Sequence, residues 1–324
     1  MRQAIKNIPI LGKVFILIYE TLFKLFHYIR HKLLRNYISK TRWKKIEKEL
    51  VENFADSTDN EIKELLNNIK KQGKIELFNY PFVQKYNSQN IKVYYDENNG
   101  YRYVLHQVDS EYEKIYFPLD WSEQRIQAAY NDLLIEQDVE SPHCYFNKDF
   151  PVPENAIILD CGVAEGNFSI SNVKRAKHIY LFEGSDEWQK PLQLTFDKWK
   201  EKVTLVPKYI SDIDQESYIT LDSWLGGGRY DVLNERVFVK MDIEGYEERA
   251  LYGFRETLNK IQEITMAVCS YHRQDSEKNI KDFFEKEGNY KIATSKRYMI
   301  LNHFCDELCF PYMRKGIVFV QKVL

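Results

Sequence analysis

The chain has 324 residues, enough for two domains or for one large domain with an extension. With 44% hydrophobic residues, 15% aromatic residues and a net charge of −2, it is neither a disordered chain nor a strongly basic one, and we expect no nucleic-acid partner. The five cysteines show no dense spacing pattern, which excludes a disulfide scaffold and favours a cytoplasmic protein.

Residues 1–50 differ from the rest in charge, because they hold 12 Lys and Arg against 3 Asp and Glu. Their apolar run has helical periodicity, but Lys13, Glu20 and Lys24 interrupt it before it reaches the ~20 residues of a membrane span. Residues 8–48 therefore predict a basic amphipathic segment. Such a segment can lie on an anionic membrane surface, here the inner face of the membrane. It can equally pack on the body of the protein, or on a second copy in a homo-oligomer.

Residues 51–139 predict an extension that mixes helices and strands. Glu61–Lys71 has a helical pattern that stops at Gly73, and Trp121–Asp138 has another. Between them, ENNG joins IKVYYD to YRYVLHQV, which is typical of a β-hairpin. The two prolines of FPVPEN end this region, so we place a domain boundary near 140–152.

From residue 140 to 324 strands and helices alternate regularly. The apolar runs AIILD, HIYLFE, VTLVPKYI, VFVKMD and ITMAVCSYH are mostly separated by helical stretches. This alternation predicts a doubly wound α/β fold, with a parallel sheet between two layers of helices. YKIATSKRYMILN and GIVFVQKVL end the chain as a predicted closing hairpin.

The first of these strands enters a glycine turn, in which Asp160, Gly162 and Gly166 have the spacing D-x-G-x-x-x-G. Glycines let the backbone turn sharply and approach a ligand, although many such turns are only structural. Ala164 replaces the second glycine of the dinucleotide pattern G-x-G-x-x-G, which disfavours a dinucleotide. Glu183 ends the next strand, where a carboxylate can accept both hydroxyls of a ribose. A nucleoside ligand without pyrophosphate points to S-adenosylmethionine.

These motifs resemble the FkbM family of class I S-adenosylmethionine-dependent methyltransferases. The resemblance covers about residues 140–320 and rests on DCGVAEGNFS, the acid of YLFEG, a Ser-Asp pair, ITLDSW and KMDIEGYEERAL, in the family's order. It implies a Rossmann-like sheet of seven mostly parallel strands and O-methyl transfer to a sugar hydroxyl, in a surface glycan or lipid-linked saccharide. It also implies that Glu183 holds the ribose, that Ser211 and Asp212 border the adenine, and that the methionine part lies among Asp160, Gly162, Glu165, Gly166 and Phe168.

Methyl transfer to an alcohol needs a base or a metal ion, because a neutral hydroxyl is a poor nucleophile. Asp242 ends the fourth strand and His272 the fifth, so both are expected at one edge of the sheet. His272 has a suitable ordinary pKa for the base, and Asp242 could orient it. Lys240 could pair with the acids or hold a substrate oxygen. Alternatively, Asp242, Glu244 and His272 could bind a divalent metal ion, although their spacing does not select one.

Several alternatives stay open on the sequence alone. In SPHCYF, just before the domain, His143 and Tyr145 could fold over the cofactor or could be packing residues. The whole chain could be a metal-dependent methyltransferase of a small-molecule hydroxyl, or a non-catalytic Rossmann-like binding module. The acids at 160, 183 and 242, together with His272, argue against the binding module, because a chain that had lost its activity need not keep them.

Overall fold

The computed structural model describes residues 43–228, 230–301 and 310–323. Most of the predicted basic amphipathic segment, residues 8–48, lies outside these ranges. Within them, no helix is both long enough and apolar enough to cross a membrane.

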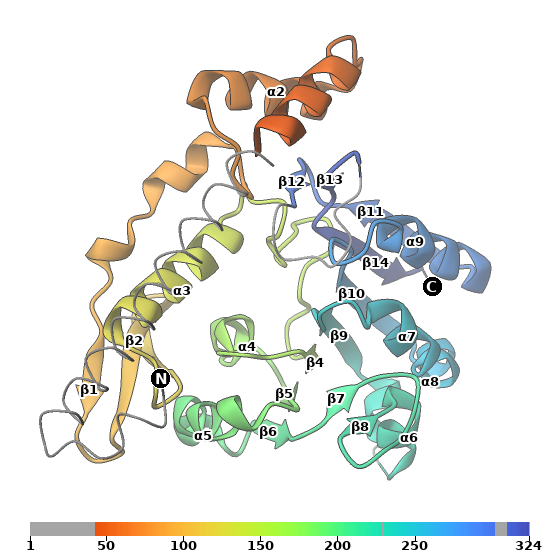
Figure 1. Ribbon diagram of the computed structural model, residues 1–324. Helices are drawn as coiled ribbons and strands as arrows, with labels where there is room; N and C mark the ends of the chain where they lie inside the picture. Colours follow the sequence, from red (N-terminus) through yellow and green to blue (C-terminus); the bar gives the residue numbers. More distant parts are fainter. Residues whose placement is uncertain (1–42, 229, 302–309, 324) are drawn as a thin grey trace, which may run out of the picture.

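The N-terminal layer consists of a helix over residues 43–54 and of α2 (Asn60–Gln72). The Asp59 side chain accepts hydrogen bonds from the first backbone N–H groups of α2, and Gly73 ends the helix in the left-handed conformation. The helix predicted over 61–71 is therefore confirmed. Its apolar side packs on the short hairpin of β12 (Met299–Ile300) and β13 (Met313–Arg314), which places this layer at one end of the molecule (Figure 1).

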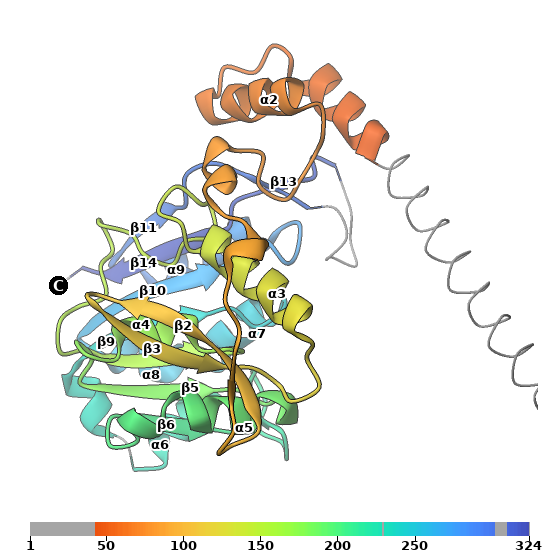
Figure 2. The same cartoon turned by 90° about the vertical axis from the view of Figure 1, so that its left-hand side faces the viewer.

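The rest of the extension is a small antiparallel sheet and a helix. β1 (Tyr94–Asp96), β2 (Tyr101–Val108) and β3 (Glu111–Tyr116) form the sheet, which confirms the predicted hairpin. α3 (Glu123–Glu136) runs beside it (Figure 2).

The main sheet has seven strands in the order β11-β14-β10-β9-β4-β5-β6. Among the described strands of this sheet, β14 alone runs opposite to the other six, so its pairs with β10 and β11 are antiparallel and the remaining pairs are parallel. The predicted doubly wound, mostly parallel sheet with a closing hairpin is confirmed. Its strands are β4 (Ile157–Cys161), β5 (His178–Phe182), β6 (Val203–Val206), β9 (Arg236–Met241), β10 (Glu263–Cys269), β11 (Tyr290–Thr294) and β14 (Ile317–Lys322). Beside them, β7 (Tyr209–Ile210) pairs with β8 (Tyr218–Ile219).

Two hydrophobic cores cover the two faces of this sheet, because successive side chains of a strand point to opposite faces. Ile158 and Phe238 belong to one core, and Leu159 and Val239 to the other. The first core is closed by α3, the small sheet, α4 (Asn167–Asn172) and α5 (Asp186–Thr195). The second is closed by α6 (Leu221–Gly226), α7 (Glu247–Tyr252), α8 (Arg255–Lys260) and α9 (Ser276–Glu287). The extension thus shares a core with the sheet, and the domain boundary near residue 140 stays a prediction.

The strand order changes direction between β4 and β9. The strands that follow β4 lie on one side of it, and those from β9 onward lie on the other. Doubly wound proteins bind ligands outside the carboxyl ends of the strands at such a switch point. A ligand site is therefore expected at the turns that follow β4 and β9.

Candidate functional site

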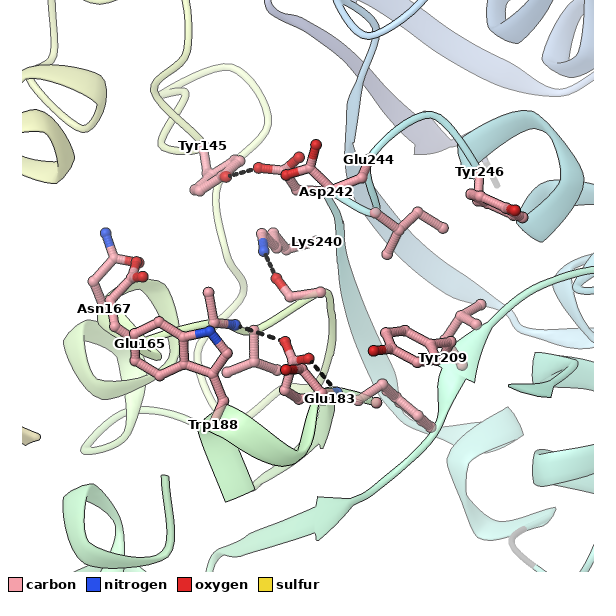
Figure 3. Close-up of a pocket in the computed structure, with 18 of the residues that line it drawn as sticks. Tyr145, Glu165, Asn167, Glu183, Trp188, Tyr209, Lys240, Asp242, Glu244 and Tyr246 are labelled. Atoms are coloured by element: carbon pink, nitrogen blue, oxygen red, sulfur yellow. Dashed lines mark hydrogen bonds between the residues drawn. The ribbon is translucent and has the colours of Figure 1, made fainter. Parts of the chain in front are cut away.

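A cavity of about 490 Å³ opens at this switch point (Figure 3). Its volume is within the range of about 300–1,000 Å³ that small-molecule sites occupy. The turns after β4, β5 and β9 line it, together with the end of α3 and two residues of SPHCYF, His143 and Tyr145. Six predicted site residues are in the lining: Gly162, Glu165, Glu183, Lys240, Asp242 and Glu244.

The turn after β4 is held close against the turn after β9. Gly162 has a φ of +80°, and a Cβ there would lie 1.8 Å from the carbonyl oxygen of Asp242, so only glycine fits. The Lys240 ammonium donates to the Gly162 carbonyl and lies 3.3 Å from Asp160 Oδ1. Burial alone would lower the pKa of Lys240, but Asp160 and Asp242 raise it, so this lysine is charged. Asp160 therefore holds the lysine that supports the turn, and it does not itself line the cavity.

Glu183 is fixed in position by two backbone groups. Its Oε2 accepts from the N–H of Ala164 at 2.9 Å, and its Oε1 accepts from the N–H of Ser185 at 2.8 Å. Each carboxylate oxygen keeps a second lone pair that can accept from a ligand hydroxyl. The residue predicted to hold a ribose thus faces the cavity in a fixed orientation.

Asp242 lies at the centre of the site, where several donors converge. The Tyr145 hydroxyl donates to its Oδ2 at 2.5 Å, and His143 Nε2 lies 3.6 Å from the same oxygen. Burial alone would raise the pKa of Asp242, but Lys240 and His272 hold it well below its usual range. Asp242 is therefore a carboxylate near neutral pH, which suits it to orient partners and makes it a poor base.

His272 lies behind Asp242 and outside the lining of this cavity. Its Nε2 is 3.5 Å from Asp242 Oδ1, and its Nδ1 is 2.9 Å from Oε1 of the buried Glu247. Burial alone would lower the pKa of His272, but Glu247 and Asp242 raise it to about 9. His272 is therefore an imidazolium at neutral pH. His143 differs, because burial lowers its pKa to about 4.

A possible metal-binding group lies around Asp242 and His272. Ligand atoms of Asp242, Glu247 and His272 lie within 4.8 Å of one another. The predicted set had Glu244 in place of Glu247, and in the structure Glu244 Oε2 lies 3.6 Å from His272 Nε2. Glu247 also accepts from the backbone N–H groups of Ile243 and Gly245, so it has a structural task of its own.

Two further carboxyl groups of the lining have raised pKa values. Burial raises the pKa of Glu165 to about 7. Burial, then the charges of Asp242 and Glu165, raise the pKa of Glu136 well above its usual value. Glu136 was not predicted as a site residue, because the sequence pattern of α3 does not indicate that the end of this helix reaches the sheet edge. In all, one lysine faces five carboxyl groups in the lining: Glu136, Glu165, Glu183, Asp242 and Glu244.

The remaining predicted residues lie close to the cavity without lining it. Asp212 forms an ion pair with Arg249 at 2.7 Å, and the lining beside it comes instead from Tyr209 and Ile210 of β7. Phe168 is buried and packs against Tyr145. Ser211 and Gly166 are buried outside the lining.

No family model and no curated protein matches the sequence. Solved structures that match in part include a tRNA m1G37 methyltransferase of Methanocaldococcus jannaschii, at 15% identity and a TM-score of 0.36, over 70% of this chain and 58% of that one. Trm5b of Pyrococcus abyssi matches at 12% identity and a TM-score of 0.34, over 72% of this chain and 62% of that one. An rRNA methylase of Streptococcus thermophilus matches at 10% identity and a TM-score of 0.31, over 53% of this chain and 90% of that one. The chain itself has a Rossmann-like α/β fold with a small-molecule cavity at its switch point.

Proposed function

We propose that the chain is an S-adenosylmethionine-dependent O-methyltransferase, of the FkbM family that its motifs resemble, and that it acts on a sugar hydroxyl in a surface glycan or lipid-linked saccharide. One observation carries the cofactor assignment: the Glu183 carboxylate, fixed by two backbone N–H groups, faces a cavity at the switch point. A carboxylate in this position accepts ribose hydroxyls.

The charge of the lining supports the same cofactor. Five carboxyl groups face a single lysine, and that lysine is already engaged by Asp160 and the Gly162 carbonyl. Such a lining offers a pyrophosphate little free positive charge, which disfavours NAD, and its Asp242 carboxylate stabilises a cationic sulfonium. When bound, the cofactor supplies an electrophilic methyl group. Glu183 would hold its ribose, Gly162 and Glu165 its methionine part, and Tyr209 and Ile210 its adenine.

The catalytic base is proposed from the groups around Asp242. The sequence favoured His272, which stays a prediction, and its ion pair with Glu247 argues that it carries a proton before the reaction starts. His143 lines the cavity as a neutral imidazole and is a second candidate. Alanine substitution of the true base should lower turnover by about 10²- to 10⁴-fold and leave cofactor affinity nearly intact. If both variants stay fully active, neither histidine is the base.

The acceptor assignment draws on the motif resemblance and on the acidic lining. The matched RNA methyltransferases raise the question of an RNA acceptor, but the described lining offers a phosphate backbone one lysine, which Asp160 and the Gly162 carbonyl already engage. A cytoplasmic location, at the inner face of the membrane, would bring the chain to lipid-linked saccharides. Metal dependence is a competing proposal, and loss of activity in EDTA with recovery in magnesium or manganese would support it.

The cofactor proposal is tested by titration calorimetry. S-adenosylmethionine and S-adenosylhomocysteine should bind at about micromolar strength, near −8 kcal/mol, and NAD negligibly. Glu183→Gln should weaken both by about tenfold or more, because the amide loses one acceptor oxygen and the charge. The exposed Glu201→Gln is the matched control. Saturable NAD binding without any response to S-adenosylhomocysteine would overturn the proposal.

A further inference from the structure

A second cavity, of about 620 Å³, lies between the N-terminal layer and the carboxyl edge of the main sheet. Most of its wall is apolar and comes from the connection after α2 and from the strand β12 region: Ile75, Leu77, Phe78, Val83, Met299 and Leu301. Its polar part lies at the other side, where α3 contributes Asp132 and Glu136 and the sheet edge contributes Glu244 and His272. The cavity therefore has an apolar part and an acidic part.

The two cavities share part of their lining. Glu136, Glu244 and Tyr271 line both the cofactor cavity and this second one. A methyl group can pass between two bound molecules only where those molecules meet, in line and within contact distance. The three shared residues mark that meeting place.

From this arrangement we propose that the second cavity binds the methyl acceptor, an uncharged molecule whose reacting hydroxyl lies beside an apolar group, and that Glu136, in place of His272 or His143, takes the hydroxyl proton. The proposal rests on the methyltransferase function proposed above and deepens it.

The wall chemistry selects this class of acceptor. Apolar side chains bind an alkyl or aryl group by removing it from water. Four carboxyl groups, those of Glu76, Asp132, Glu136 and Glu244, can form hydrogen bonds with hydroxyls, and the described lining contains no lysine or arginine that would bind a phosphate or a sulfate. Among the described lining residues His272 is the single basic one, and its charge is already shared with Glu247. A glycoside with an apolar aglycone meets these requirements, and a sugar phosphate does not.

The position of Glu136 and its raised pKa suit it to act as the base. Its Oε2 lies 4.0 Å from Nδ1 of His143. The charged groups that face it are Asp132 on its own helix and, from the sheet edge, Asp242, Glu244 and the turn residue Glu165. Burial and these like charges raise its pKa well above the usual range of a glutamate, and a raised pKa makes a carboxylate a stronger base. In the transfer, the acceptor oxygen bonds to the methyl carbon, the carbon–sulfur bond breaks with its electron pair left on sulfur, and the hydroxyl proton moves to Glu136.

The acceptor site is tested on the whole chain saturated with S-adenosylhomocysteine. The probes are octyl hexosides below their micelle concentration, the matching methyl hexosides, and glucose 6-phosphate. Octyl hexosides should bind about tenfold tighter than methyl hexosides or more, and glucose 6-phosphate should not bind. Leu77→Trp and Val83→Trp fill the apolar part and should each weaken octyl hexoside binding by about tenfold, with S-adenosylhomocysteine affinity kept. Leu119→Trp, at an exposed site, is the matched control.

The outcomes separate the two proposals. If S-adenosylhomocysteine does not bind, the methyltransferase function fails. If it binds but chain length makes no difference to hexoside affinity, or if glucose 6-phosphate competes, only the acceptor proposal fails. Leu77→Trp and Val83→Trp are both used, so that the test can still be made if one of them fails to fold. The thermal transition of each variant shows whether it is folded.

The role of Glu136 is tested by turnover of bound octyl hexosides with S-adenosylmethionine. Glu136→Gln should lower kcat by about 10²-fold with little change in KM, and it should remove the acidic limb of the kcat–pH profile. Glu123→Gln, exposed in the first turn of the same helix, should leave both unchanged. An unchanged pH profile in Glu136→Gln, or no transfer to any bound octyl hexoside, would overturn the proposal.

Discussion

The Glu165 carboxyl should make cofactor binding depend on pH in a way that reports the sulfonium charge. In the free protein the pKa of this group is raised to about 7 by burial. A bound sulfonium nearby would favour the carboxylate and lower that pKa. For a group whose pKa falls on binding, affinity is full above the free pKa and is lost as pH falls through it. S-adenosylmethionine should therefore bind more weakly at pH 6 than at pH 8.

The size of the effect follows from the ionised fraction of Glu165. With a pKa of about 7, this fraction is roughly one eleventh at pH 6 and ten elevenths at pH 8, so affinity should change by about tenfold, or ~1.4 kcal/mol. S-adenosylhomocysteine has the same amino-acid and adenosine parts without the sulfonium charge, so the ratio of the two affinities cancels other titrations. Calorimetry at both pH values should show that ratio rising about tenfold in the wild type and staying nearly constant in Glu165→Gln. A ratio independent of pH in the wild type would refute the reasoning.

Three further predictions concern the turn, the buried ion pair and the N-terminal segment. Gly162→Ala should lower the free energy of unfolding by about 2–4 kcal/mol and abolish cofactor binding, while Gly226→Ala, whose Cβ would meet no atom within 4 Å, should do neither; urea titration measures both. Because the pKa of His272 is raised to about 9, the protonated side chain stabilises the fold. This stabilisation is complete below the unfolded pKa of about 6.5 and is lost as pH rises through 9. The free energy of unfolding should therefore fall by about 3 kcal/mol over this window in the wild type and by much less in His272→Gln. The whole chain should co-sediment with anionic vesicles at low salt, and a chain that begins at residue 43 should not. If the segment instead packs on the protein, truncation should lower the temperature of the thermal transition or dissociate an oligomer.

The sequence predicted the parts of the site that lie on the main sheet. The apolar runs of β4, β5 and β9 are short, and each ends in a charged residue, so the positions of Asp160, Glu183 and Asp242 at one sheet edge follow from strand patterns alone. Gly162 could be assigned to a turn, although its clash partner, the backbone of Asp242, is visible only in three dimensions. Local pattern and strand order together position these groups.

Residues brought in by packing could not be predicted in the same way. Tyr145 reaches Asp242 from a segment without regular secondary structure, and nothing in its neighbours fixes that path. Glu247 is the first residue of α7, a position where acidic residues are common. In the structure it accepts from two backbone N–H groups and holds His272, and so it changes the protonation of the residue chosen as the base. The pKa of a side chain depends on such partners, and contacts between residues far apart in the sequence cannot be read from the hydrophobic periodicity of either segment.

The division of labour between the two parts of the chain explains why the motifs say so little about the acceptor. The motifs of the resemblance lie on or beside the main sheet, and DCGVAEGNFS, YLFEG and KMDIEGYEERAL contribute residues to the lining of the proposed cofactor cavity. The second cavity instead takes much of its apolar wall from residues 75–83 and its proposed base, Glu136, from the end of α3. These elements precede residue 140 and share the hydrophobic cores that hold them against the sheet. A change of acceptor could therefore arise in the extension while the cofactor turns stay the same, as expected when function resides in sites built onto a common fold.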